Sequence, residues 1–339
     1  MPSRSAAIVV ALLLSALAVL AAACGVTGDR PGTAAAGSEQ RLEVVTTVAP
    51  VTSIVANVAG DMADVAGLVP EGTNSHTFEP PPSAAKALSD ADVVFLNGLQ
   101  LEEPIKDLTR RRLAKGAEVV ELGNRTVRPD EYIYDFSFPK EEGKPNPHLW
   151  TNPPMAKQYA RIAADTLKRR DPSRAGAYEA NFGRFSAKVD ELDAAMVAAS
   201  RTVPQRELLT DHDAYAYFAR HYGWKVIGAI QVSDFDDPTP KEVADLIAQV
   251  KAEGVPAIFG SEVFPSPVLA QIGREAGVRY VDVLRDDDLP GALGQPEHSW
   301  LGLMRFNFIT MVESLGGDAS ALRAVKVENA APDTAHYPQ

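Results

Sequence analysis

Three histidines stand in loop-like stretches and could do chemistry together. His76 lies in NSHTFEP, His148 in NPHLWTNP and His212 in TDHDAYAYF. They are 72 and 64 residues apart, so no single helix or hairpin carries all three. Neutral imidazole is the commonest metal ligand in proteins and suits Zn²⁺. The three side chains predict a metal site if the fold brings them together, and are otherwise solvated or structural histidines.

A carboxylate would complete such a site, because oxygen ligands accompany imidazoles in many zinc centres. Asp282 in RYVDVL is the expected fourth ligand, and Glu262 in GSEVF is its competitor. The other histidines are assigned to ordinary roles: His221 on a helix, His298 at a helix start and His336 in a polar tail.

The loop around His148 is unusually constrained. In KPNPHLWTNP three prolines, Pro145, Pro147 and Pro153, fix φ and discourage helix in the residues before them. We therefore expect a stiff loop that holds His148 in place before a metal arrives. Trp150 is interpreted as a packing anchor for this loop.

The elements that must position these side chains alternate between strand and helix. Short Val-rich runs at 41–50, 64–70, 91–98 and 117–123 alternate with helical stretches, and a second series runs from 206 to 285. This alternation predicts parallel βαβ units with helices over the sheet. Ligands of such folds bind outside the carboxyl ends of the strands, which is where the three histidines fall.

A helix-rich segment lies between the two series. Pro172 divides it into one helix before the proline and one of roughly 25 residues after it, which at 1.5 Å per residue spans about 35 to 40 Å. We predict an α/β protein of two Rossmann-like lobes joined by a long, rigid linker helix. The expected bounds are 42–174 for the N-terminal lobe, 175–203 for the helix, 204–328 for the C-terminal lobe and 329–339 for a flexible tail.

The N-terminus predicts export. Arg4 precedes an apolar run at 6–24 that ends in small residues, which is typical of a secretory signal at 1–23. Cys24, the single cysteine, follows three alanines as in a bacterial lipobox, although the usual leucine stands one place early, at Leu20. We expect a lipid anchor at Cys24 and a tether over 24–41. A plain signal peptide and an uncleaved anchor are the alternatives.

Bulk charge excludes one class of partner. The formal net charge of −12 over 339 residues argues against nucleic acid, whose phosphates require clustered Lys and Arg. It suits a protein that handles cations, although many soluble proteins are as acidic for solubility alone.

The order of these motifs resembles one family. The stretches VVTTVAPVTSIVANVAGD, GTNSHTFEPPPS, ADVVFLNGLQLEEPI, NPHLWTNP, LTDHDAYAYFARHYGW and MRFNFITMVESLGG occur in the order found in solute-binding proteins of metal-ion ABC importers. The resemblance spans about residues 42 to 325. It implies an exported receptor, not an enzyme, that binds a divalent metal between two lobes and delivers it to a permease.

The resemblance also implies the ligands. His76, His148, His212 and Asp282 match the positions of the family's ligands. At the third position, where this chain has His212, zinc receptors keep His and manganese receptors have Glu. Three imidazoles and one carboxylate suit tetrahedral Zn²⁺, whereas Mn²⁺ prefers more oxygen. We therefore predict Zn²⁺, with Mn²⁺ as the alternative.

Two departures from the family pattern stand out. Asn146 replaces the usual acid ahead of His148, and the region EYIYDFSFPKEEGKPN has no His, whereas many zinc receptors carry a His-rich loop there. Glu79, Asp213 and Glu262 are expected to hold the ligating imidazoles through their second ring nitrogens. A monomer is expected. A zinc-dependent hydrolase and a surface adhesin remain the alternatives from other classes, although the sequence lacks H-E-x-x-H.

Overall fold

The computed structural model describes residues 41–230, 238–261 and 266–338. Two of the predicted functional residues, Cys24 and Glu262, therefore lie outside the described residues. The described residues form one compact unit.

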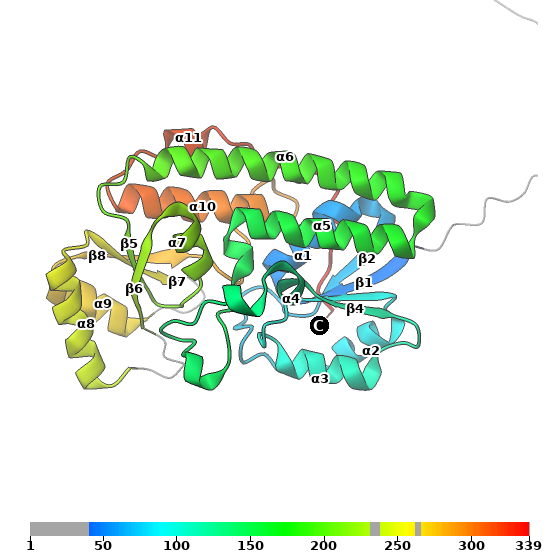
Figure 1. Cartoon of the computed structure of the whole chain (residues 1–339), viewed down its shortest axis with the longest axis horizontal. Helices are drawn as coiled ribbons and strands as arrows, with labels where there is room; N and C mark the ends of the chain where they lie inside the picture. Colours follow the sequence, from blue (N-terminus) through cyan, green and yellow to red (C-terminus); the bar gives the residue numbers. More distant parts are fainter. Residues whose placement is uncertain (1–40, 231–237, 262–265, 339) are drawn as a thin grey trace, which may run out of the picture. The chain divides into compact units, whose positions relative to one another are not determined.

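Two parallel four-stranded sheets are present in the described part of the chain, in agreement with the predicted two α/β lobes (Figure 1). The first sheet has the order β2-β1-β3-β4 and the second β6-β5-β7-β8, so both halves follow one topology. Strands form in both predicted series: β1 Leu42–Thr46, β2 Ala63–Gly67, β3 Val93–Leu96, β4 Glu118–Glu121, β5 Glu207–Thr210, β6 Lys225–Ala229, β7 Ala257–Ser261 and β8 Arg279–Leu284.

Helices connect the strands as the alternating pattern predicts. Several begin with proline in the first turn, where its missing N–H costs no hydrogen bond. The α-helices are α1 Ala49–Ala59, α2 Pro82–Asp90, α3 Glu103–Arg112, α4 Leu122–Thr126, α5 Pro153–Arg170, α6 Ala175–Ser200, α7 Ala216–Tyr222, α8 Pro240–Glu253, α9 Pro267–Ala276, α10 Trp300–Ser314 and α11 Ser320–Arg323. Short 3₁₀ turns occur at Gly60–Met62, Pro129–Glu131, Lys140–Glu142, Leu149–Thr151 and Pro172–Arg174.

The long helix after Pro172 is confirmed as α6, with 26 residues. It lies between β4 and β5 in the chain and packs against α5, α1 and α10. In its first half Asn181 donates a hydrogen bond to Val58 O of the N-terminal lobe. At its last residue the Ser200 hydroxyl accepts from the indole of Trp224, next to β6. The helix is thus bonded to residues of both lobes, and its role as a rigid strut remains a prediction.

A pair of buried tryptophans joins α10 to the loop that carries His148. Trp300, the first residue of α10, donates its backbone N–H to the Ser53 hydroxyl of α1 at 2.9 Å. Its indole donates to Trp150 O at 3.0 Å, and both rings are fully buried. The prediction that Trp150 anchors this loop by packing is confirmed.

The predicted flexible tail is wrong for the described residues up to 338. His336 pairs with the edge strand β2, donating its N–H to Val65 O and accepting from Gly67 N. Asn57 of α1 binds Asn329 and the backbone N–H of Ala330. The polar sequence suggested a free tail because hydrophobic periodicity is missing, but backbone pairing with an open strand edge requires none.

Gly67 tests this packing. A Cβ at Gly67 would lie 2.4 Å from Tyr337 Cε1 and 2.7 Å from the Thr52 hydroxyl. Gly67→Ala should therefore lower the free energy of unfolding by about 1–3 kcal/mol, measured by urea denaturation. In a Tyr337→Ala background the loss should be smaller, because one of the two clashes is gone.

Gly183→Ala is the matched control, since its Cβ would meet nothing within 4 Å on α6. It should be neutral or stabilising by up to about 1 kcal/mol. Equal effects of Gly67→Ala with and without the Tyr337 ring would contradict the packing described here.

Candidate metal centre

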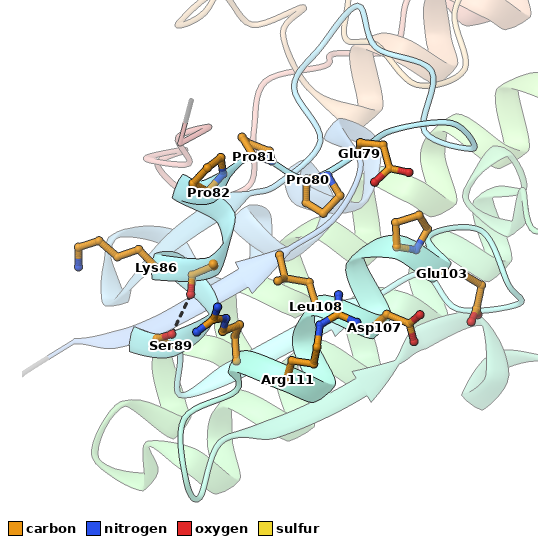
Figure 2. Close-up of a pocket in the computed structure, with 13 residues that line it drawn as sticks. Glu79, Pro80, Pro81, Pro82, Lys86, Ser89, Glu103, Asp107, Leu108 and Arg111 are labelled. Carbon is orange, nitrogen blue, oxygen red and sulfur yellow. Dashed lines mark hydrogen bonds between the residues drawn. The ribbon is translucent and has the colours of Figure 1, made fainter.

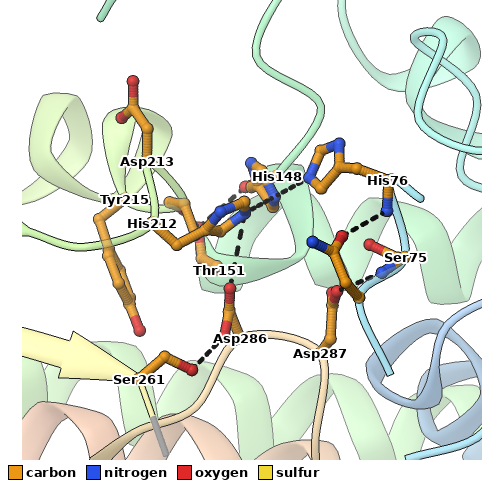
Figure 3. Close-up of polar contacts among 12 residues, drawn as sticks. Ser75, His76, His148, Thr151, His212, Asp213, Tyr215, Ser261, Asp286 and Asp287 are labelled. Atoms are coloured by element: carbon orange, nitrogen blue, oxygen red, sulfur yellow. Dashed lines mark hydrogen bonds and ion pairs between the residues drawn. The ribbon is translucent and has the colours of Figure 1, made fainter. Parts of the chain in front are cut away.

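Three predicted histidines meet between the two lobes. His76 follows β2 in the first lobe, His148 ends the proline-rich loop before α5, and His212 follows β5 in the second lobe. Each contributes one ring nitrogen to a group whose atoms all lie within 4.8 Å of one another. His148 Nε2 lies 3.2 Å from His76 Nε2 and 2.8 Å from His212 Nε2 (Figure 3).

The spacing of these nitrogens suits a small cation. In a tetrahedral zinc site with Zn–N bonds of about 2.0–2.1 Å, neighbouring nitrogens lie about 3.3 Å apart. The two measured separations are 3.2 and 2.8 Å. An opening of the His148–His212 contact by about half an ångström would bring both separations to the value of a tetrahedral site, and the third pair, His76 and His212, lies within 4.8 Å.

The carboxylate beside the cluster is Asp286, which corrects the prediction of Asp282. Asp282 lies within β8 and is exposed. Asp286 is buried, and its Oδ2 lies 3.5 Å from His212 Nε2. That oxygen has no hydrogen-bond partner although it is buried, which fits the role of a metal ligand. Its position was predictable from His212, since each residue follows its strand, β5 or β8, by two places.

Asp286 is fixed in place by its surroundings. Trp150 donates its indole N–H to the backbone oxygen of Asp286 at 3.0 Å, and the Ser261 hydroxyl lies 3.4 Å from Oδ1. The neighbouring Asp287 accepts the backbone N–H of Ser75 at 3.2 Å, which ties the loop of His76 to the second lobe. Burial, and then the charge of Asp286, raise the pKa of Asp287 to about 7.

Asn146 sets the orientation of His148. Its Oδ1 lies 2.9 Å from His148 Nδ1 and also accepts the backbone N–H of His148 at 3.1 Å. Its Nδ2 donates to Asp213 O at 2.7 Å, so the amide can face only one way. His148 therefore carries its proton on Nδ1 and turns the lone pair of Nε2 toward the other two rings.

The loops that bear His148 and His212 are also joined directly. The Thr151 hydroxyl lies 2.8 Å from both His148 O and Ala214 O. Such buried contacts hold the two imidazoles in register before any ligand binds, which lowers the ordering cost of binding.

Two of the imidazoles are held neutral. The pKa of His76 lies well below its usual range, chiefly because most of its ring is buried and also because the His212 imidazole lies next to it. Burial also lowers the pKa of His148, with smaller contributions from His212 and His76. Neutral rings are the state that binds a metal, so the folded protein keeps these ligands available near neutral pH.

The predicted supporting carboxylates Asp213 and Glu79 lie in different surroundings. Asp213 is buried next to the site, but its Oδ2 accepts the backbone N–H of Ser137 at 3.2 Å, while its carbonyl serves Asn146. Glu79 is exposed and lines a separate groove of about 970 Å³ between α2 and α3 (Figure 2). The amide that holds His148 is thus Asn146, which sequence reasoning noted only as a departure.

The remaining histidines have other partners. His221 on α7 lies 2.8 Å from Asp193 Oδ1, and His298 lies 3.0 Å from Glu71 Oε1. His336 pairs through its backbone with β2. Their assignment to ordinary structural roles agrees with these contacts.

Two parallel α/β lobes that jointly enclose three imidazoles and a carboxylate define a two-lobed receptor for metal ions. A family model described as zinc-uptake complex component A, periplasmic (ZnuA), matches residues 44–314. The chain therefore belongs to this family.

Individual relatives cover nearly the whole chain. The manganese-binding lipoprotein MntA of Halalkalibacterium halodurans is 28% identical over 89% of this chain and 97% of its own length. The iron-binding protein YfeA of Yersinia pestis is 27% identical over 82% of this chain and 87% of its own length. Among solved structures, the periplasmic zinc-binding protein TroA of Treponema pallidum has a TM-score of 0.73 at 24% identity, covering 81% of this chain and 99% of that chain.

The first prediction from this geometry concerns Asn146. Asn146→Asp would place a carboxylate oxygen against Asp213 O, where the amide now donates at 2.7 Å, and near the carboxylate of Asp135. Acceptor facing acceptor in a buried site should lower the free energy of unfolding of the metal-free protein by about 1–3 kcal/mol. Denaturant titration measures this. A more stable Asp variant would show that the bond to His148 dominates.

The second prediction concerns pH. Because the folded-state pKa of His148 is depressed, the unfolded chain takes up a proton near pH 6.5 that the folded chain does not. As pH falls below 6.5, the metal-free wild type should lose stability relative to His148→Gln by about 1.4 kcal/mol per pH unit. Chemical unfolding between pH 7.5 and 5.5 measures the difference. Asp287 contributes to stability in the opposite direction, but both proteins share it, so it cancels in the difference between their free energies of unfolding. A difference that does not change with pH would contradict a neutral, buried His148.

Proposed function

We propose that this protein captures a divalent metal ion between its lobes and delivers it to an ABC importer. The observation that carries the proposal is the cluster of three imidazole nitrogens, with Asp286 Oδ2, which has no hydrogen-bond partner, 3.5 Å from one of them. His76 and His148 come from the first lobe, and His212 and Asp286 from the second, so bound metal would bridge the two.

We further propose Zn²⁺ as the metal. Three nitrogen ligands and one carboxylate oxygen match the tetrahedral preference of Zn²⁺, whereas Mn²⁺ favours more oxygen ligands and stands lower in the affinity order for nitrogen sites. The names of the relatives span zinc, manganese and iron, so the choice rests on the donor set.

Delivery requires a partner in the membrane. Several relatives are named as substrate-binding lipoproteins of metal ABC transporters, for example PsaA of Streptococcus pneumoniae, which supports a permease as the partner here. Within the described residues, no helix is long and apolar enough to cross a membrane. We propose that Cys24 carries a lipid that holds the protein at the outer face of the cell membrane.

Competition between metals tests the proposal. Metal-free protein should bind one Zn²⁺ in preference to Mn²⁺, with elemental analysis giving the stoichiometry. His148→Ala should weaken zinc binding by at least about a hundredfold, because second-sphere losses alone cost about 10–100-fold. Mn²⁺ binding that excludes Zn²⁺ would overturn the zinc assignment, and full binding by His148→Ala would overturn the site.

Asp286 and Asp282 form a matched pair for the fourth ligand. Asp286→Asn should weaken zinc binding, because it removes the charged oxygen that lies 3.5 Å from His212. Asp282→Asn, four residues earlier and exposed on β8, should bind zinc as the wild type does. The reverse result would restore Asp282 as the ligand.

A further inference from the structure

A small cavity opens onto the metal centre at His76. It measures about 90 Å³ and is bounded by His76, by the turn Leu99–Leu101 and by parts of the loop 137–147. His76 is partly exposed, whereas His148 and His212 are buried. Of the three imidazoles, His76 is therefore the one that a metal arriving through this cavity meets first.

Phe138 forms the inner wall of this cavity. Its ring centroid lies 5.8 Å from that of His76 and 5.7 Å from that of His148, and its side chain is 6% exposed. These are ordinary distances for aromatic contacts. One side chain thus covers two of the proposed ligands.

The turn that presents Phe138 is fixed to the second lobe. Asp135 and Phe138 exchange backbone hydrogen bonds at 3.0 and 3.2 Å, closing a tight turn. Between them, Ser137 donates its N–H to Asp213 Oδ2, one residue after His212. Phe136 points outward from the same turn and is 49% exposed. Separation of the lobes would therefore draw Phe138 away from His76.

The opposite wall of the cavity is a strained turn. Leu99 and Gln100 adopt φ of 53° and 64°, a left-handed conformation that residues with a Cβ seldom take. Gln100 donates its side-chain amide to Gly143 O at 3.1 Å, which links this turn to the loop of Phe138. Strained backbone that persists next to a binding site indicates a functional constraint.

The cavity is narrow, with about 90 Å³ of space for the centres of water molecules. Because Phe138 and the turn of Leu99 and Gln100 form its walls, a metal ion that reaches His76 through the cavity passes between them. The wall made by Phe138 belongs to a loop that bonds to the second lobe at Ser137 and to the turn of Gln100 at Gly143, whereas His148 is fixed by Asn146.

We propose that Phe138 is the gate through which the metal exchanges at His76, and that it sets the rate of exchange while leaving the coordination unchanged. The inference rests on the proposed metal-binding function. It assigns control of metal exchange to a side chain in the loop 137–147 that is not itself a metal ligand.

Stopped-flow measurement on the full chain tests the gate. Zn²⁺ uptake is followed through Trp150, whose ring lies 5.0 Å from His148, and release through transfer to a chromogenic chelator in excess. Phe138→Ala should speed both uptake and release about tenfold, a barrier change of about 1.4 kcal/mol. The dissociation constant should change by less than about threefold, because both rates rise together.

Phe136→Ala is the matched control. It makes the same change two residues away, at a side chain on the exposed side of the turn, and its uptake and release rates should equal those of the wild type. Phe138→Leu keeps an apolar side chain at the gate, so its uptake and release rates should lie between those of the wild type and of Phe138→Ala. This milder change keeps the test informative if the alanine variant misfolds. Unchanged rates in Phe138→Ala would overturn the gate, as would weaker binding with an unchanged uptake rate, which would make Phe138 a structural support.

The two proposals fail separately. A wild-type protein that binds no Zn²⁺ at equilibrium would overturn the proposed function. If the wild type binds one Zn²⁺ but Phe138→Ala and Phe138→Leu both exchange the metal at the wild-type rate, only the gate is overturned.

Discussion

The hydrogen bond between Asn146 Oδ1 and His148 Nδ1 is the contact on which the metal centre depends. It fixes the tautomer of His148 and directs Nε2 at the two other imidazoles. The amide is itself oriented by Asp213 O, so the second lobe determines how a ligand of the first lobe is aimed. A carboxylate in place of Asn146 would be a stronger acceptor for the imidazole but could not donate to that carbonyl. The neutral amide is therefore the residue that satisfies both neighbours.

The centre is assembled from loops at the carboxyl ends of strands in two similar lobes. His212 and Asp286 each follow a strand of the second sheet by two residues, and His76 lies in the loop after β2 of the first sheet. Carboxyl ends of parallel strands collect ligands in this way in α/β folds. Contacts between the lobes, such as Ser75 with Asp287 and Ser137 with Asp213, surround the site and close it. Binding and lobe geometry are thus coupled through the same few loops.

Much of the fold was predictable, because the strands are short apolar runs that alternate with helical stretches, and those of the first sheet are rich in Val. The three histidines were also predictable from their places in loops and at strand ends. Asp282 was expected because a carboxylate near the end of a later strand was sought and because the family resemblance implied it. It is exposed within β8, and the carboxylate beside His212 lies two residues beyond the strand end. Asn146 and Phe138 were not identified as functional, because their roles depend on Asp213 and on two imidazoles that are distant in sequence.

The C-terminal segment has a consequence beyond its packing on the first lobe. β2 stands at one end of its sheet, and its outer side would offer unpaired N–H and carbonyl groups to any strand that approached. His336 occupies two of those groups at Val65 and Gly67. Residues that carry no metal ligand thereby cover two of the backbone groups through which an open sheet edge could pair with another strand.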